Sequence, residues 1–314
     1  TEIYTLSLHD ALPICDYITA ESFTGHSAEL NGSLYHLFNP GDLAPLYAVL
    51  RGAIHGAFYT RDRDTDPEFQ VPDDEASLIW RAGLRLGGRE PYLSPQLAGE
   101  FSLWYEGQYR FNHDYYGFNG DRQIEAITHL FWGRALFAYT LEKSHQHFEV
   151  SLTAGAGLDT DRFSAFRLGS FLPLVAEFPL SLPGYHIEEI SADHFALLSG
   201  QFYQPLVPSA SWNVLAFGSV GVVDYLPGFE QNDPWHAGFG AGLVYQTPSR
   251  GWQIGAAAAY GVNAMREDGR GAMSLTFMVQ YDLDAVLRGG GEPFWKPVTS
   301  TRTWQGLFRR LGTH

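Results

Sequence analysis

Two histidines and a glutamate have the residue types and the spacing of a metal site. His145 and His147 are two residues apart, and Glu142 lies close before them. Two imidazoles and a carboxylate can hold zinc, but a structural zinc site takes four ligands, and no further ligand is evident at this turn. We therefore interpret the three side chains as a solvated turn and expect no metal.

Two other groups suggest acid–base or nucleophilic chemistry. Glu188 and Glu189 are adjacent carboxylates, but neighbouring residues on a strand point to opposite faces, which favours a structural or loop role over a general-acid pair. Asp193, His194 and Ser199 have the residue types of a serine-hydrolase triad, but the chain has no G-x-S-x-G elbow. We predict a protein that is not an enzyme and that needs no cofactor.

The segments that would position these side chains follow a period of two. From Leu97 to Phe111 apolar residues and glycine occupy the odd positions, and Glu100 and Glu106 are among the even ones. A strand that crosses a bilayer needs roughly 9–11 residues, and its carboxylates cannot face lipid cheaply. The pattern therefore predicts a wet interior, lined by charges that pair across neighbouring strands. The residues predicted to line it are Arg81, Arg85, Glu100, Glu106, Arg110 and Arg134.

The same periodicity recurs along most of the chain and predicts an all-β fold. Turn signals such as Asn-Gly-Asp at 119–121 separate the periodic segments, and short and long connections alternate as in outer-membrane barrels. We predict an antiparallel transmembrane β-barrel with about 11–12 strands present, one of them a damaged strand near 31–38. The predicted strands are 46–60, 76–88, 96–111, 123–142, 146–160, 163–172, 193–206, 211–224, 235–247, 251–264 and 271–284.

The composition fits this class. Among 314 residues, aromatics make up 15%, charged residues only 18%, and glycines number 34. No run approaches the roughly 18 apolar residues of a transmembrane helix. A net charge of −15 argues against a nucleic-acid partner, which would require a basic face. Cys15 is the only cysteine, so the chain cannot form an internal disulfide.

The stretch from Phe166 to Gly221 carries a resemblance to a known family. Its three motifs are a strand end at Leu168, Gly169 and Ser170, a loop tip at Pro183, Gly184 and Tyr185, and alternating residues Phe217, Ser219 and Gly221 on the second strand after the loop. Together they resemble the BamA/TamA-type outer-membrane assembly superfamily, and their sequence is most similar to its patatin-like, surface-antigen branch. The resemblance covers roughly the C-terminal half.

The resemblance implies a long loop that folds into the barrel and packs its tip on the inner wall at Phe217–Gly221. It also implies insertion or translocation of polypeptides across the outer membrane, with membrane lipid and a client polypeptide or an attached periplasmic or passenger domain as partners. Pro183 stands where the family often has Arg, and Ser219 where it has Asp. The two charges are lost together, so neither would be left buried and unpaired. A porin-like or structural barrel remains the alternative, and an outer-membrane lipase is the third candidate.

The two ends of the chain differ from the rest. Residues 1–14 resemble the translation of a sequencing adapter, and 15–45 form a partial strand or loop region before the barrel at 46–284. Five strands follow the loop, as in the sixteen-stranded barrel of the family, so we expect a fragment that lacks the first four or five strands. In the tail, 285–314, apolar residues at helical spacing predict either a frayed helix or a membrane-surface or partner-binding helix. They are Trp304, Leu307, Phe308 and Leu311.

Overall fold

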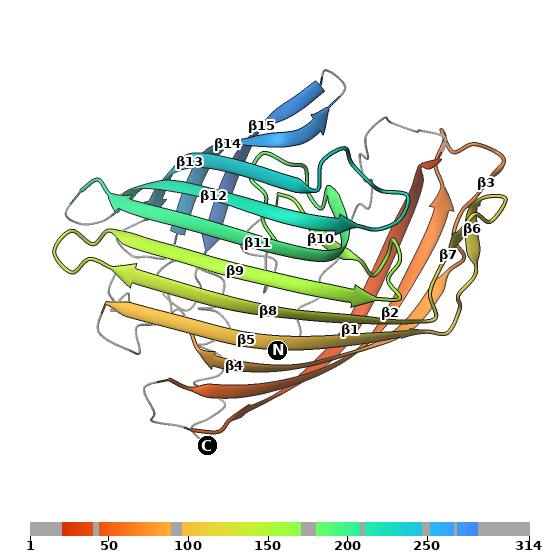
Figure 1. The fold of residues 1–314 in the computed structure, drawn as a ribbon, viewed down its shortest axis with the longest axis horizontal. Helices are drawn as coiled ribbons and strands as arrows, with labels where there is room; N and C mark the ends of the chain where they lie inside the picture. Colours follow the sequence, from red (N-terminus) through yellow and green to blue (C-terminus); the bar gives the residue numbers. More distant parts are fainter. Residues whose placement is uncertain are drawn as a thin grey trace.

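One large antiparallel sheet makes up most of the protein (Figure 1). The computed structural model describes residues 21–39, 44–88, 96–170, 180–207, 211–246, 252–266 and 269–281. The sheet order is β1-β2-β4-β5-β8-β9-β11-β12-β13-β14-β15, and β10 (Phe166–Leu168) pairs with β11 beside this path. The long strands are β1 (Phe23–Leu37), β2 (Leu46–Arg61), β4 (Glu75–Gly87), β5 (Leu97–Arg110), β8 (Ile127–Thr140), β9 (His147–Leu158), β11 (Ile190–Pro205), β12 (Trp212–Tyr225), β13 (Trp235–Gln246), β14 (Trp252–Arg266) and β15 (Gly269–Tyr281).

The sheet presents its apolar side chains outward. On β5, Phe101 and Leu103 are each 54% exposed, whereas Glu100 and Ser102 on the opposite face are buried. Cross-strand register carries each face from strand to strand, because residues that pair lie on the same side of a sheet. An exposed apolar face with a buried polar one is the reverse of a soluble sheet and is typical of strands that face lipid.

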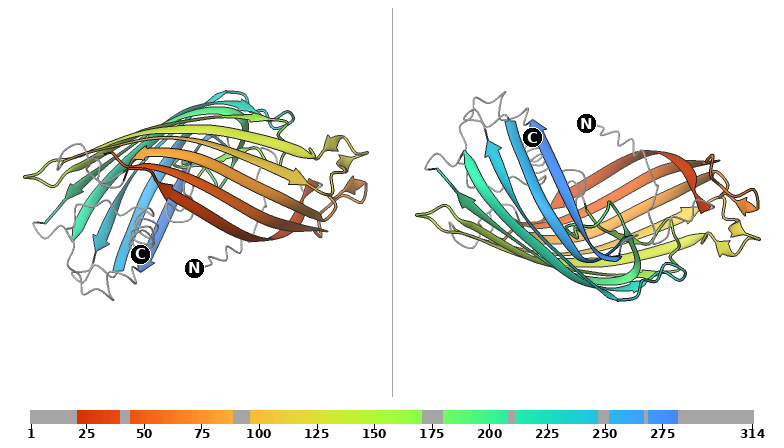
Figure 2. Two further views of the ribbon diagram at one scale, coloured as in Figure 1. Left: turned by 90° about the horizontal axis from the view of Figure 1, so that it is seen from below. Right: turned by 90° about the horizontal axis from the view of Figure 1, so that it is seen from above.

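The sheet curls around on itself, as the two further views show (Figure 2). Among the described residues, β1 and β15 each pair with one neighbour only, so the sheet has two edges. The predicted antiparallel barrel fold is confirmed, with eleven long strands along the path. Five of them, β11 to β15, follow the long loop, as the sequence predicts. Within the described residues, no helix is long and apolar enough to cross a membrane.

A small second sheet lies at the end of the barrel where the long connections are. It contains β3 (Phe69–Gln70), β6 (Tyr115–Phe118) and β7 (Arg122–Gln123), three short strands that the sequence reading does not anticipate. Its core holds Phe23, Phe69, Tyr116 and Ile124. This cluster joins the start of β1 to the two connections that follow β2 and β5.

Two predicted elements differ from the structure. The strand predicted near 31–38 is the full 15-residue β1, which pairs along its whole length with β2. The strand predicted at 163–172 is only the three-residue β10, because this stretch leaves the wall and pairs with the first residues of β11 inside the sheet. Both the proposed artefact at 1–14 and the tail at 285–314 lie outside the described residues.

Candidate functional site

The connection between β9 and β11, residues 159–189, begins at a charge anchored in the wall. The carboxylate of Asp161 lies 2.5 Å from the Arg110 guanidinium, which also contacts Glu75 at 2.9 Å. Asp161 further accepts the backbone N–H groups of Glu125 and Phe163, each at 2.9 Å. Arg110 and Asp161 are buried, so this ion pair is shielded from water and fixes the start of the loop to β4 and β5.

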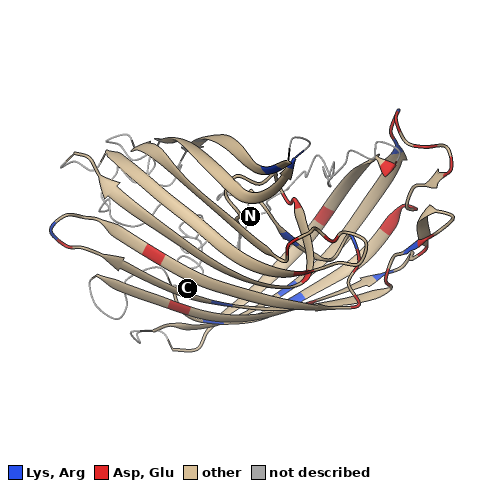
Figure 3. Cartoon of the chain, turned by 45° about the horizontal axis from the view of Figure 1, so that its top comes forward, with Lys and Arg blue, Asp and Glu red and all other residues tan. Residues whose placement is uncertain are grey.

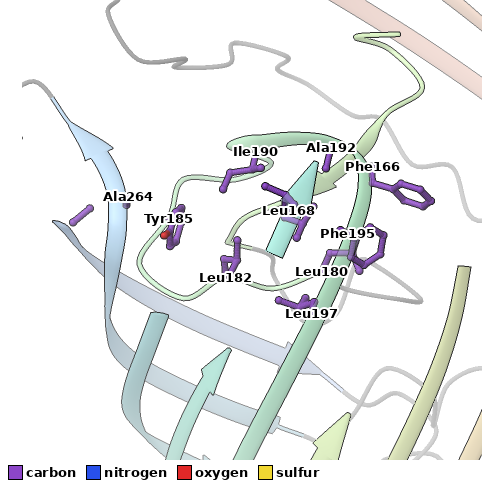
Figure 4. Packing of buried hydrophobic residues seen from close by; sticks show 12 residues of the cluster. Phe166, Leu168, Leu180, Leu182, Tyr185, Ile190, Ala192, Phe195, Leu197 and Ala264 are labelled. Atoms are coloured by element: carbon purple, nitrogen blue, oxygen red, sulfur yellow. The ribbon is translucent and has the colours of Figure 1, made fainter. Parts of the chain in front are cut away.

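The described parts of the loop lie inside the curled sheet. Leu168 and Leu182 have no exposed surface, and Tyr185 keeps 1%. They pack with side chains from the inner face of β11, β12, β14 and β15 (Figure 4). Burial of an apolar side chain of this size contributes about 2 kcal/mol, so the cluster holds the loop strongly in place. The cluster contains Phe166, Leu168, Leu180, Leu182, Tyr185, Ile190, Ala192, Phe195, Leu197, Val223, Ala264 and Ala272.

The loop tip lies against two glycines of the wall. A Cβ on Gly184 would be 1.9 Å from the backbone nitrogen of Gly261 on β14, and one on Gly238 of β13 would be 2.0 Å from the Pro183 carbonyl oxygen. Gly184 also has φ of +86°, which L side chains rarely adopt. Backbone therefore meets backbone at the tip, and this approach requires glycine on both sides.

A tyrosine–histidine chain ties the tip to β13. The Tyr185 hydroxyl lies 3.1 Å from Nδ1 of the buried His236, and Nε2 of His236 lies 2.5 Å from the Tyr225 hydroxyl. Tyr225 in turn donates to the Asp233 carbonyl at 2.5 Å. All three bonds are satisfied when Tyr185 donates to Nδ1 and a neutral imidazole donates from Nε2. Burial raises the pKa of Tyr185 above its ordinary 10.0, which keeps this phenol a donor.

A bidentate ion pair fixes the end of the loop to β14. Arg266 donates from Nη1 and Nη2 to the two carboxylate oxygens of Glu189, at 2.8 and 3.0 Å. Glu189 is buried and also accepts the His186 backbone N–H at 2.6 Å. Two-point arginine–carboxylate contacts are directional as well as strong. Glu189 thus has the loop role that the sequence favours.

The strand-end motif braces the base of the loop. The backbone N–H of Gly169 donates to Leu180, and that of Leu182 donates back to Gly169 at 2.7 Å. Ser170 donates from its backbone to the His186 carbonyl at 2.8 Å, and Leu168 is fully buried. The motif therefore joins the two described parts of the loop.

The predicted inner-wall motif lies beside the tip and not under it. Phe217, Ser219 and Gly221 share the inner face of β12, but the Phe217 ring covers Gly240 of β13. The Ser219 hydroxyl pairs at 3.0 Å with that of Ser199, and Gly221 lies against Leu197. The tip contacts the next two strands, β13 and β14.

The position of the tip on β13 and β14, and not on the predicted β12, has a physical reason. Pro183 and Ser219 have no charges to hold the tip on β12. The hydrogen bond to His236 and the ion pair of Glu189 with Arg266 both lie further along the sheet. They draw the tip toward β13 and β14. Two features of the sequence mark this position of the tip: His236 lies in an otherwise apolar strand, and Arg266 is the last residue of β14.

The predicted lining charges form ion pairs across neighbouring strands of the N-terminal half. Figure 3 marks the acidic and basic positions along the strands. Arg81 contacts Glu106 at 2.6 Å. Glu100 lies between two arginines, at 2.7 Å from Arg85 and 3.0 Å from Nε of Arg134. These side chains share the face that carries the loop, because Arg134 is linked by strand register through β9 to Leu197 of the loop cluster.

The other candidate groups do not assemble. His145 lies in an exposed turn, whereas His147 is buried on β9 and bonds to Thr140 at 2.8 Å. No three His, Cys, Asp or Glu side chains gather in a metal-binding arrangement within the described residues. His194 faces outward beside Asp224 at 3.7 Å.

The triad candidates are likewise separated. Asp193 bonds to Thr160, at the start of the loop, and Ser199 bonds to Ser219 on the inner face. His194 and Ser199 are five positions apart on one strand, which places them on opposite faces. A hydroxyl and an imidazole on opposite faces of a sheet cannot exchange a proton directly.

Comparisons with known proteins identify the fold. No protein-family model and no curated protein matches the chain. CdiB from Acinetobacter baumannii aligns with a TM-score of 0.58 at 13% identity, over 82% of this chain and 42% of its own. The β domain of the Bordetella autotransporter BrkA and the translocator domain of NalP from Neisseria meningitidis each give a TM-score of 0.34, at 10% and 12% identity. They cover 88% and 83% of this chain and 95% and 82% of their own.

The likeness to CdiB shows that the chain has an outer-membrane β-barrel fold. The chain spans less than half the length of CdiB. The comparisons do not single out the BamA/TamA-type superfamily among such barrels.

Proposed function

We propose that this chain is an integral outer-membrane barrel that inserts or translocates polypeptides without catalysis, and that the loop at 159–189 is its internal plug. The observation that carries the proposal is the tip of this loop, which lies on Gly238 and Gly261 inside the sheet. A loop of this length that packs on an inner wall is a functional element and not a plain connector. Its partners are outer-membrane lipid and an extended client polypeptide.

The contacts of the plug suit a device that is both held and released. Apart from apolar packing, two separable contacts hold the tip and the end of the loop: the Tyr185–His236 hydrogen bond and the Glu189–Arg266 ion pair. Each contributes a few kcal/mol at most, so a polypeptide that competes for the inner wall can displace the tip. The glycines beneath the tip would then leave a smooth wall for an extended chain.

The ion pair at the end of the loop also gives this chain a charge lock of its own. The family it resembles has Arg in the loop and Asp on the wall. In this chain Glu189 is on the loop and Arg266 is on β14, and Nη1 and Nη2 of Arg266 both contact the carboxylate. We propose that this reversed pair takes over the holding role that Pro183 and Ser219 cannot have.

A photo-crosslinking experiment tests the proposal. A photoreactive residue replaces Ser219 on the inner face or, as the matched control, Val220 on the exposed outer face of the same strand. The protein is reconstituted in lipid vesicles, and an unfolded polypeptide is added. We expect adducts from position 219 and not from 220. In Arg266→Glu the adducts increase, and in the double variant Glu189→Arg/Arg266→Glu they return to the original level.

The alternative predicts a different result. A porin-like barrel admits small solutes, so position 219 would give no polypeptide adduct whether or not the charge pair is intact. That outcome would replace the translocation proposal with the porin-like one. Within the residues that the structure describes, Asp193, His194 and Ser199 do not come together as a lipase triad would.

A further inference from the structure

We propose an anion-binding site on the inner wall, formed by Arg85 on β4, Ser102 on β5 and Arg134 on β8, that takes a carboxylate or phosphate group. Strand register places the three residues in one row, since Arg85 pairs with Ser102 and Ser102 pairs with Arg134. Side chains that pair in this way start about 5 Å apart on the same face. A small group between them is therefore within reach of all three.

The row has more positive than negative charge. Glu100 is the carboxylate that both arginines contact, Arg85 at 2.7 Å and Arg134 at 3.0 Å. The pair next to it joins one arginine, Arg81, to one glutamate, Glu106, at 2.6 Å, and Arg81 also lies over the Trp132 ring. Two guanidiniums that share one carboxylate leave a local excess of positive charge, and a second anion would neutralise it.

Hydrogen-bond donors in the row are left over. Nε of Arg85 and the hydroxyl of Ser102 are buried without a hydrogen-bond partner, whereas Nη2 of Arg85 lies 2.7 Å from the Glu100 carboxylate. Ser102 has no exposed surface at all. Buried donors without partners are costly, and most native proteins satisfy them. The planar fork of an arginine matches the two oxygens of a carboxylate or phosphate.

The site is separate from the plug. Arg85 lies two residues before the end of β4, at the end of the barrel with the short connections. The loop tip docks near the opposite end, where β13 begins and His236 is its second residue. The anion site therefore goes beyond the proposed function, and each can fail without the other.

Thermal unfolding of the full chain in detergent tests the site. Sodium phosphate or sodium acetate replaces sodium chloride at constant ionic strength, and the unfolding midpoint is followed. A ligand that binds only the folded state raises the midpoint in a saturable way. We expect this rise in the natural chain, its loss in Arg85→Gln, and a roughly threefold to tenfold weaker affinity in Ser102→Ala, which removes one donor. Glu100→Gln should bind more tightly, because it removes the competing carboxylate.

Arg51→Gln is the matched control. Arg51 pairs in register with Arg81 on the same inner face and has a one-to-one ion pair with Glu29. It should leave the rise unchanged. A preference for acetate would indicate a polypeptide carboxylate as the source, and a preference for phosphate would indicate a phosphate-bearing molecule; both support the site.

Two results would overturn the proposal: a natural chain that responds equally to all three anions, or an Arg51→Gln variant that loses the rise as fully as Arg85→Gln. Should Arg85→Gln not fold, Arg85→Lys keeps the charge but loses the fork. An unchanged affinity in that variant would count equally against the site.

Discussion

The inner face of this barrel has two different walls. Along β4, β5 and β8 it carries long charged side chains that pair with one another, such as Arg81 with Glu106. Along β12 to β14 the inward positions next to the loop tip are small, among them Ser219, Gly238 and Gly261, and β13 has no Asp, Glu, Lys or Arg. The first wall is covered by its own side chains, and the second is covered by a loop.

The comparison shows that the inward side of a strand can be covered in two ways. Charged side chains that meet across strands need no other part of the molecule, but they keep other backbone away. Glycine leaves room for a loop to approach within van der Waals contact, and the loop then supplies the missing side chains. The charged wall on β4, β5 and β8 is therefore held by its own ion pairs, and the glycine wall on β13 and β14 is a surface on which the loop lies. Four substitutions test this difference.

Removal of one buried charge from the charged wall should lower the stability of the barrel more than any of the other substitutions. Arg110→Met leaves Glu75 and Asp161 as buried carboxylates without their common partner. Breaking a buried ion pair in this way costs about 3–5 kcal/mol of unfolding free energy. Denaturant unfolding in lipid vesicles measures it. Arg51→Met, at a more exposed pair, should cost under about 1 kcal/mol. Equal losses in both variants would mean that burial does not matter here.

The outer face supplies the reference for both walls. Leu152 and Ser151 are neighbours on β9, one exposed outward and the other on the inner face. Leu152→Arg should destabilise the barrel in a bilayer by about 2–4 kcal/mol of unfolding free energy. Ser151→Arg should destabilise it much less, because only position 152 faces lipid. The same vesicle assay compares them. A larger loss for Ser151→Arg would reverse the assignment of the faces.

The contact between the loop tip and β14 should be lost when Gly184 is replaced by a larger residue. In Gly184→Val the new side chain collides with the Gly261 backbone at a φ of +86°, which costs about 2 kcal/mol and expels the tip. Gly228→Val is matched to it, since Gly228 has φ of +84° and open space around its Cβ position. Protease accessibility of the loop should rise in the first variant only. A rise in both would indicate backbone strain and not contact.

The smallest effect should come from the polar contact of the tip. Tyr185→Phe removes one hydrogen bond to His236, which is worth about 1 kcal/mol. Burial raises the pKa of this phenol, so below pH 10 it is neutral in both the folded and the unfolded chain. Above that pH only the unfolded chain loses the proton, and stability falls as pH rises. The difference in unfolding free energy between the natural chain and Tyr185→Phe, measured by denaturant unfolding, should therefore become smaller above pH 10. A difference that stays constant with pH would contradict the buried Tyr185–His236 hydrogen bond.

Much of the fold can be predicted from periodicity. The alternation along Leu97 to Phe111 gives the strand, its two faces and its ion-pairing side, because β side chains alternate strictly. The alternation of short and long connections also follows from turn residues. β10 cannot be predicted in the same way, since a short strand inside a loop has the same local pattern as one that spans the wall.

The site is harder to predict than the fold. Resemblance points to the loop tip at Pro183–Tyr185, but not to the strands on which it lies. The Gly-x-Gly-x-Gly pattern at 238–242 and the inward His236 mark that place in the sequence. Their meaning depends on register over three strands, which is a property of the folded sheet.

The most direct test of the account is the distance between the loop tip and β13. Cysteines replace Tyr185 and His236, Cys15 is replaced by serine, and a short bifunctional thiol reagent is added to the protein in lipid vesicles. The Ser199→Cys/Ser219→Cys pair, whose hydroxyls lie 3.0 Å apart, serves as the positive control. We predict that 185 and 236 become linked as readily as the control pair. If the control pair becomes linked and positions 185 and 236 do not, the tip does not lie on β13, and the proposed internal plug is wrong.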